Sequence, residues 1–331
     1  MTPKKKLFIT GASGFVGRHL VKKLNKRKYL ITVLLRKKSD TPFFMKMGIK
    51  VILGDLTHHK TFIGQLNKCD ILVNLAGIRA NWGVKEEFFK INSEVIKKFF
   101  SKESSLKHII ITSSVYAMGR LSKIPADETS LLSGLGIYGK SKIRAEEITK
   151  ELSSNFNIPY TIIRPAIIYG PNDNERGMLV KMISLVKNNR FLIIGNGKNL
   201  LHLIYIDDLV QGFINAIEMG GHNQTYILAA AKPITLYNLL LLIRKELNIK
   251  ISLKYIPRLP VLLVAYIYEL IYKIGFMLLP NLFKKEPFIS PVKVYTLTDN
   301  FSYDTRKAKK ELKFNPKIDY EKGIKNAIRA L

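Results

Sequence analysis

A glycine-rich turn near the start of the chain constrains the fold more than any other feature. The stretch TGASGFVG places glycines at 11, 14 and 17, between an apolar run at 7–10 and a helical pattern that begins at residue 15. In such a turn the first glycine permits tight bending, the second admits a bound group, and the third lets helix and strand pack closely. The positive end of a helix attracts phosphate. The stretch therefore predicts a dinucleotide site, and a merely tight βα turn is the alternative.

Short β-rich runs alternate with helical periodicity through the first 170 residues. Strands are predicted at 7–10, 30–35, 50–53, 71–75, 108–112 and 160–163, and helices at 15–26, 57–67, 86–102 and 138–155. This alternation predicts an α/β fold with a Rossmann-type doubly wound parallel sheet. The rhythm becomes irregular after about residue 170. We therefore expect a cofactor-binding domain at 1–170 and, at 171–331, mostly a smaller C-terminal substrate-binding lobe, interleaved with late strands of the sheet that include about 200–215.

The composition is strongly basic, with 54 Lys and Arg against 25 Asp and Glu and a net charge of +29. Nucleic acid, an anionic membrane surface, phosphorylated small molecules or simply a solvated lysine-rich surface would each fit this charge. The sequence shows no recognised nucleic-acid module, and His58 and His59 lack further ligands, so we expect no nucleic-acid partner and no metal. The single cysteine, Cys69, excludes an internal disulfide, and the N-terminus is unlike a signal peptide. We expect a cytoplasmic protein.

One apolar segment, at 259–283, stands apart from the rest. Its only charges are Glu269 and Lys273, four residues apart and able to pair on one helical turn. Pro260 and Pro280 bracket roughly 19 residues, close to the ~20 that span a bilayer. The segment fits a buried or substrate-lining helix, a helix lying on a membrane surface, or a span, although the two charges argue against a span. The basic stretch LFKKEPF would suit anionic headgroups.

The stretch IYGKSK supplies a candidate proton-transfer pair. Tyr138 and Lys142 lie four residues apart at the start of a predicted helix, so both point to one face. A phenol has a pKa of about 10, and a nearby ammonium favours its ionised form. Ser113 and Ser114 follow a predicted strand at the edge where such sheets bind ligands. A serine hydroxyl there can bond the substrate oxygen that the tyrosine protonates or deprotonates.

The end of the second predicted strand bears on the choice of cofactor. A domain that binds NAD usually carries an acidic residue there, about 20 residues after the glycines, for the ribose hydroxyls. This chain has LLRKKSD, with Arg36 at that place and Lys37 beside it. A guanidinium suits a 2′-phosphate, so NADP is favoured over NAD; the alternative is an ordinary surface arginine.

Together these motifs resemble the extended short-chain dehydrogenase/reductase family, the NAD(P)-dependent epimerase/dehydratase group, over nearly the whole chain. The resemblance implies catalytic roles for Ser114, Tyr138 and Lys142, with Ser113 as the competing serine. Tyr138 would be the general acid/base, Lys142 would lower its pKa and hold the nicotinamide ribose, and Ser114 would orient the substrate oxygen. The implied cofactor-binding residues are Gly11, Ser13, Gly14, Phe15, Val16, Gly17, Arg36, Asp55, Leu56, Leu75, Ala76, Gly77, Asn92, Thr112, Ser113, Tyr138, Lys142, Pro165 and Ile168.

Differences between this chain and typical family motifs reduce the number of reactions that we expect it to catalyse. Sugar-nucleotide 4,6-dehydratases usually read Thr-Asp-Glu where this chain has Thr-Ser-Ser at 112–114, which disfavours elimination chemistry. Many UDP-sugar epimerases carry an asparagine where this chain has Ile167. RPAIIYGP is more similar to the 3β-hydroxysteroid dehydrogenase and dihydroflavonol reductase branch. We expect an alcohol/ketone oxidoreductase with a fairly apolar small-molecule substrate. The alternatives are a nucleotide-sugar epimerase or reductase and a non-catalytic NAD(P)-binding module. The resemblance also suggests a homodimer that uses the helix at 138–155.

Two further side chains have open roles. Trp82, after the fourth predicted strand, is either a lid aromatic at the substrate entrance or simple packing. His202 lies in the family-like stretch HLIYIDDLV, and a lone histidine of this kind is more often structural than a base.

Overall fold

The computed structural model describes residues 4–25, 29–173, 177–220, 223–250 and 253–331. Its main sheet has seven parallel strands in the order β11-β6-β5-β4-β1-β2-β3. These strands are β1 (Lys6–Thr10), β2 (Leu30–Leu35), β3 (Lys50–Leu53), β4 (Ile71–Asn74), β5 (His108–Thr112), β6 (Tyr160–Pro165) and β11 (Gln224–Leu228). The order runs outward from β1 in both directions, so the predicted doubly wound α/β fold is confirmed. All six predicted strands are present, each within about two residues of its predicted ends.

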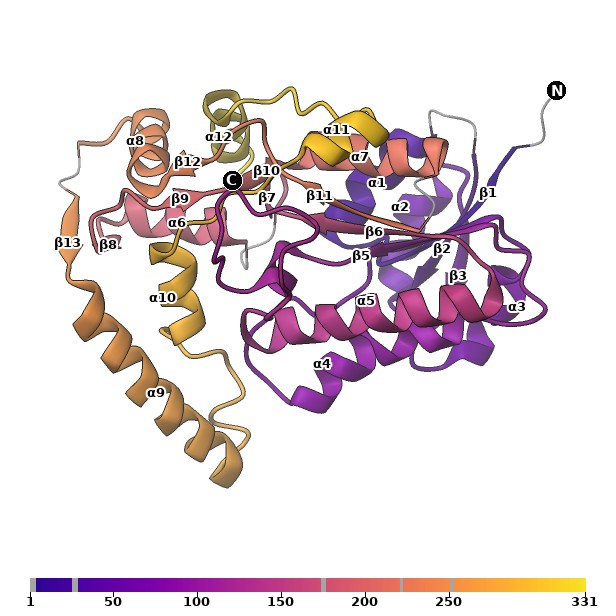
Figure 1. Ribbon diagram of the computed structural model, residues 1–331, viewed down its shortest axis with the longest axis horizontal. Coiled ribbons are helices and arrows are strands. Elements are labelled where there is room, and N and C mark those ends of the chain that lie inside the picture. The colour runs from indigo at the N-terminus through magenta and orange to yellow at the C-terminus, as the bar shows by residue number, and fades with distance from the viewer. Residues whose placement is uncertain (1–3, 26–28, 174–176, 221–222, 251–252) are drawn as a thin grey trace.

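Helices cover both faces of this sheet (Figure 1). On one face α1 (Phe15–Asn25) packs beside α7 (Ile206–Met219), and on the other α4 (Lys85–Asn92) packs beside α5 (Gly136–Phe156). The predicted helix at 86–102 is broken at Ser93, whose hydroxyl donates to the Phe89 carbonyl at 2.7 Å. The chain continues as a 3₁₀ helix, η3 (Glu94–Phe99). Such side-chain bonds to the preceding turn compete with regular helix geometry.

The other short elements of the first half follow the chain order. They are η1 (Lys38–Asp40), α2 (Thr41–Met45), η2 (His59–Thr61), α3 (Ile63–Leu66) and η4 (Val115–Met118). Two of them, η2 and α3, replace the single helix predicted at 57–67. Lys26, the last residue of the helix predicted at 15–26, lies outside the described residues.

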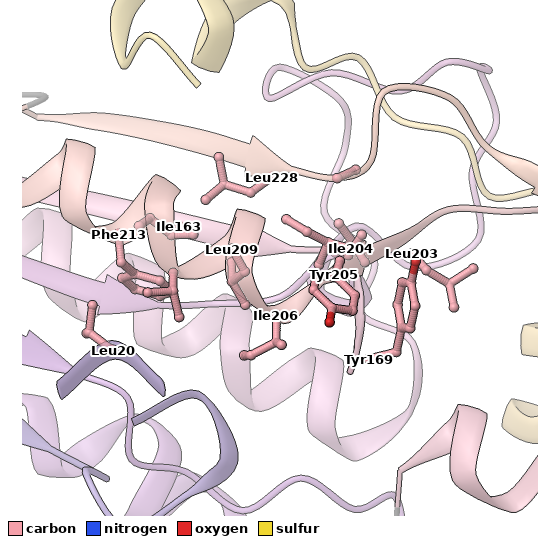
Figure 2. Packing of buried hydrophobic residues seen from close by; sticks show 14 of the residues in the cluster. Leu20, Ile163, Tyr169, Leu203, Ile204, Tyr205, Ile206, Leu209, Phe213 and Leu228 are labelled. Carbon is pink, nitrogen blue, oxygen red and sulfur yellow. The ribbon is translucent and has the colours of Figure 1, made fainter. Parts of the chain in front are cut away.

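The largest apolar core joins the sheet to α1 and α7. Figure 2 shows Leu20 of α1, Ile163 of β6 and Phe213 of α7 packed together, with side chains of β10 and β11 beside them. All three of these side chains are fully buried. Because the central strands are covered on both faces, they are apolar at successive positions, as parallel sheets require. This core fixes the strand ends from which the functional loops extend.

Apart from α7 and β11, which belong to the main sheet and its covering layer, most of the second half of the chain lies in a smaller body beside the sheet (Figure 1). Its strands pair in two-stranded sheets: β7 (Ile167–Tyr169) with β10 (Leu203–Tyr205), β8 (Leu192–Ile194) with β13 (Lys254–Ile256), and β9 (Leu200–Leu201) with β12 (Ile234–Thr235). Its helices are α6 (Met178–Lys187), α8 (Leu236–Leu247), α9 (Arg258–Leu278), α10 (Pro291–Thr298) and α12 (Tyr320–Arg329), while α11 (Arg306–Glu311) packs against β11 of the main sheet.

The stretch at about 200–215, expected to supply strands of the main sheet, has a different structure. It holds β9 and β10, which belong to two-stranded sheets, and the first part of α7. The amphipathic run after Tyr205 carries Asp207 and Asp208 in its first turn, which suits a helix N-terminus. The seventh strand of the main sheet is instead β11. A division of the chain near residue 170 stays a prediction.

Candidate active site

The glycine turn joins β1 to α1 and touches the loop that follows β4. Gly11 has a φ of +68°, and a Cβ placed on it would lie 2.6 Å from the backbone N of Ala76. A Cβ on Gly17 would lie 2.4 Å from the Gly11 carbonyl oxygen. Both glycines are therefore required by backbone packing, as their spacing predicts.

Gly14 has a different environment. A Cβ there would meet only the Gly11 carbonyl oxygen, at 3.2 Å, and the residue is exposed. The space beside Gly14 suits the close approach of a diphosphate, and the first turn of α1, Phe15 to Gly17, points N–H groups without intrahelical acceptors toward it. Arg18 lies beside the turn. Its Nε donates to the Ser13 carbonyl, and its Nη2 pairs with Asp40 at 2.7 Å. This arrangement fits a dinucleotide.

Arg36 and Asp55 lie at the ends of β2 and β3. The Asp55 carboxylate accepts hydrogen bonds from the N–H and the hydroxyl of Thr57, both at 2.7 Å. These bonds, with a smaller contribution from the Arg36 charge, lower the pKa of Asp55. Arg36 itself is exposed, while Leu56 is buried in the core, so its side chain serves packing.

The loop after β4 is held against α5 by Asn92. The Asn92 Oδ1 accepts from the Ile78 N–H at 2.7 Å, and its Nδ2 donates to the Ile78 carbonyl at 3.1 Å and to the Ser141 hydroxyl at 2.9 Å. A Cβ on Gly77 would lie 3.4 Å from Lys142 Nζ. Asn92 therefore supports the segment that contains Leu75, Ala76 and Gly77.

Ser114, Tyr138 and Lys142 come together at the carboxyl edge of the sheet. Ser114 follows β5, and its hydroxyl is hydrogen-bonded to the Tyr138 phenol. Lys142 Nζ donates to the carbonyl oxygen of Thr112 at 2.8 Å and lies 5.8 Å from the centre of the Tyr138 ring. The i, i+4 spacing at the start of α5 places both side chains on the face toward β5, as predicted.

Burial dominates the acid–base properties of this group. It raises the pKa of Tyr138, against smaller lowering effects of the Ser114 hydrogen bond and the Arg79 charge. Burial also lowers the pKa of Lys142 to about 8, against the raising effect of Glu146. The spacing of Tyr138 and Lys142 predicts that the Lys142 ammonium lowers the pKa of Tyr138. In the structure that ammonium bonds Thr112 instead, and desolvation keeps the phenol protonated.

Ser113 does not join the group. Its side chain is fully buried, and its hydroxyl donates to Glu146 Oε1 at 2.5 Å. Consecutive residues in an extended chain point to opposite sides, so Ser114 faces Tyr138 while Ser113 faces the interior. Glu146 also pairs with Arg164, and sequence reasoning missed both residues. The signal was present: Arg164 interrupts an apolar strand, and Glu146 lies one helical turn after Lys142.

The last predicted contacts lie on β6 and β7. Pro165 is buried at the end of β6, opposite Leu228 of β11. Ile168 lies in β7, opposite Ile204, and is partly exposed. Pro165 therefore lies at the carboxyl edge of the main sheet, and Ile168 lies in the two-stranded sheet that follows it.

Both residues with open roles make packing contacts, and a lid role for Trp82 stays a prediction. Trp82 donates its indole N–H to the Phe283 carbonyl at 2.8 Å and contacts Tyr272 of α9 edge to face. His202 stacks on Tyr303, accepts the Tyr303 N–H and bonds the Ala230 carbonyl at 2.8 Å, and burial lowers its pKa to about 4. Among the described residues, no group of three or more His, Cys, Asp or Glu side chains is placed to hold a metal.

Comparisons with known proteins agree with this geometry. The chain is 24% identical over 329 residues to a 4-hydroxy-2-methyl-3-oxo-4-farnesyl-3,4-dihydroquinoline-1-oxide ketoreductase of Stigmatella aurantiaca, covering 97% of this chain and 95% of the relative. It is 27% identical over 344 residues to a decarboxylating sterol-4-alpha-carboxylate 3-dehydrogenase of Candida albicans, covering 96% and 95%. The fold matches UDP-glucuronic acid 4-epimerase from Bacillus cereus in complex with NAD, with a TM-score of 0.77, 19% identity and 98% of each chain covered.

A family model described as "NAD dependent epimerase/dehydratase family" matches residues 7–229, which include the glycine turn and the Ser114, Tyr138 and Lys142 group. That match covers well over half of the chain. The chain therefore belongs to the NAD-dependent epimerase/dehydratase family, and it is an enzyme of that family.

Proposed function

We propose that the protein is an oxidoreductase that transfers hydride between nicotinamide C4 and an alcohol or ketone. The grouping of Ser114, Tyr138 and Lys142 beside the glycine turn is the observation that supports this most strongly. The bound cofactor supplies or takes up the hydride, and the protein supplies position and proton transfer.

In this proposal each side chain has one role. The Ser114 hydroxyl donates a hydrogen bond that orients the substrate oxygen. Tyr138 gives its phenolic proton to that oxygen during reduction, or removes it during oxidation. Because burial raises the pKa of Tyr138 above the usual value of about 10, the phenol carries its proton at neutral pH and can donate it to a ketone oxygen. Lys142 holds the ribose hydroxyls and balances charge on Tyr138 when the proton leaves.

The substrate is proposed to be fairly apolar. Ile167 lies in β7, at the place where many UDP-sugar epimerases carry an asparagine, and its side chain is hydrocarbon. A nucleotide diphosphate would need donors at such a place, and an isoleucine side chain has none. The names of the ketoreductase and sterol dehydrogenase relatives are consistent with an apolar ketone or alcohol.

NADP is proposed as the preferred cofactor because Arg36 ends β2 with an exposed guanidinium. A guanidinium can bind the 2′-phosphate through two parallel hydrogen bonds. We also propose that the protein is cytoplasmic and contacts a membrane surface through residues 259–283. We further propose a homodimer that forms through α5.

The test follows the absorbance of reduced nicotinamide with a 3-ketosteroid and, separately, with UDP-glucose. Stoichiometric loss of the reduced cofactor with the ketosteroid is expected. Tyr138→Phe should lower kcat by about 10²- to 10⁴-fold. Tyr116→Phe is the matched control, because the Tyr116 hydroxyl already bonds Thr296 at 3.1 Å, and it should lose less than about tenfold.

Two outcomes would overturn this proposal. Conversion of UDP-glucose without net change in absorbance would identify an epimerase, which regenerates its cofactor. Full biological activity of a folded Tyr138→Phe variant would instead favour the non-catalytic binding module.

A further inference from the structure

Among the described residues, α9 carries more exposed large apolar side chains than any other helix or strand. Of the 21 residues in this helix, all of which are described, only Val261 and Ala265 are buried. Ten large apolar side chains are between 47% and 78% exposed: Leu259, Leu263, Val264, Tyr266, Ile267, Leu270, Ile271, Ile274, Met277 and Leu278. Soluble monomers rarely expose so large a contiguous apolar surface without a partner.

The shape of this face distinguishes between partners. At about 100° per residue, the ten side chains cover an arc of about 160° around the helix. Within α9 no charged residue falls inside that arc, and Lys273 lies just outside its edge. A helix that pairs with a second copy usually shows a narrower apolar seam with charges on both sides. A broad arc without charged residues is better suited to the acyl chains of a bilayer than to a second helix.

The opposite face of α9 is attached to the protein. Trp82 contacts Tyr272 and Phe276, and the buried Val261 and Ala265 pack with Val294 of α10. Figure 1 shows α9 at the margin of the molecule with α10 along one side. The helix is long and apolar enough to cross a membrane by length and composition alone. Because one face is packed on the protein, the fold favours a helix that lies along a bilayer.

The charges near this face favour anionic lipid. Glu269 and Lys273 form an ion pair at 2.6 Å, so they add no net charge. Lys284 and Lys285 are exposed just after the helix, next to Leu282 and Phe288, which are 75% and 80% exposed. Lysines at the edge of an inserting apolar surface attract acidic headgroups. The net charge of +29 adds to this attraction.

We propose that α9 and the segment 279–288 form a docking surface for an anionic bilayer. The ten-residue face enters the boundary between headgroups and acyl chains, while Lys284 and Lys285 contact phosphate. The proposal rests on the proposed function in one respect only. If the substrate is apolar, the enzyme could take it from the bilayer to which it is bound.

The experiment measures flotation of the full chain with vesicles of phosphatidylcholine alone or of equal parts phosphatidylcholine and phosphatidylglycerol. Binding to the anionic vesicles is expected, with at least tenfold weaker binding by Ile267→Glu. The matched control, Leu241→Glu, changes an exposed apolar residue on α8 and should bind like the unchanged protein. Lys284→Glu with Lys285→Glu should weaken binding to anionic vesicles and reduce its salt dependence.

The single tryptophan supplies a second readout. Trp82 contacts the inner face of α9, so its emission should change when anionic vesicles are added to the unchanged protein and should stay constant in Ile267→Glu. Circular dichroism and cofactor binding check that each variant is folded. Equal flotation of Ile267→Glu and the unchanged protein would overturn the proposal, as would absence of flotation with either vesicle. A dimer that Ile267→Glu dissociates, without vesicle binding, would show that a second copy covers the face.

This test is separate from the test of hydride transfer. Reduction of a water-soluble ketone needs no vesicles, and flotation needs no substrate. Either result can fail while the other holds.

Discussion

The Glu146 carboxylate accepts two hydrogen bonds from the Arg164 guanidinium, at 2.8 Å from Nε and 2.7 Å from Nη2, in the interior of the protein. The two side chains are 1% and 2% exposed. Through the third bond, from Ser113, this pair ties α5, which carries Tyr138, to the end of β5. The proposed catalytic group therefore rests on a buried ion pair between α5 and β6.

Removing the charge of Glu146 should destabilise the protein. Glu146→Gln leaves the Arg164 guanidinium buried without its counter-charge. Removing one partner of a buried ion pair lowers the free energy of unfolding by about 3–5 kcal/mol. Urea denaturation measures the loss. Glu147→Gln is the control, because Glu147 is exposed on the same helix and should change stability by less than about 0.5 kcal/mol. Equal midpoints for the two variants would contradict this account of the ion pair.

Lys142 should destabilise the fold at neutral pH. Burial lowers its pKa to about 8, from 10.5 when exposed, so the unfolded chain binds more protons between these values. Stability due to this residue therefore rises as the pH increases from 8 to 10.5. The free energy of unfolding of Lys142→Met, measured relative to the unchanged protein, should be about 2 kcal/mol higher at pH 7 than at pH 10. The variant should also lose hydride transfer. Denaturation at the two pH values gives this difference, and a gain that does not depend on pH would refute it.

Gly17 should tolerate no side chain. A Cβ would lie 2.4 Å from the Gly11 carbonyl oxygen and 2.6 Å from Ala12 Cα, so the turn must shift. Gly17→Ala should cost about 1–3 kcal/mol and weaken cofactor binding, which calorimetry measures. Gly64→Ala is the matched control: no atom lies within 4 Å of its added Cβ, and the residue is helical, so a gain of up to about 1 kcal/mol is expected. If both variants bind cofactor equally, the role given to the turn is wrong.

Arg36 should determine the cofactor preference. Arg36→Asp removes a charge-assisted contact to the 2′-phosphate and offers a carboxylate to the ribose, so the ratio of kcat/KM for NADPH over NADH should fall by about 10- to 100-fold. Lys150→Asp, on the exposed side of α5, makes the same change in net charge and should leave the ratio unaltered. A ratio that stays constant in Arg36→Asp would make Arg36 an ordinary surface residue.

The amino-acid sequence by itself determined the strand and helix rhythm, the glycine turn, and the pairing of Tyr138 with Lys142. Each of these depends on a short spacing: period 2 or 3.6 in apolar residues, three residues between glycines, and four between phenol and amine. Such spacings fix local geometry whatever lies elsewhere in the chain. They also placed the serine at the end of β5, since parallel strands share one carboxyl edge.

Tertiary structure decided the rest, because it depends on residues far apart in the chain. Only the fold shows that Ser113 faces Glu146 while Ser114 faces Tyr138, and that burial keeps the phenol protonated. Only the fold shows that α9 packs one face on Trp82 and leaves the other to solvent. An apolar run has the same composition whether it is buried or exposed, and what surrounds it is set by distant segments.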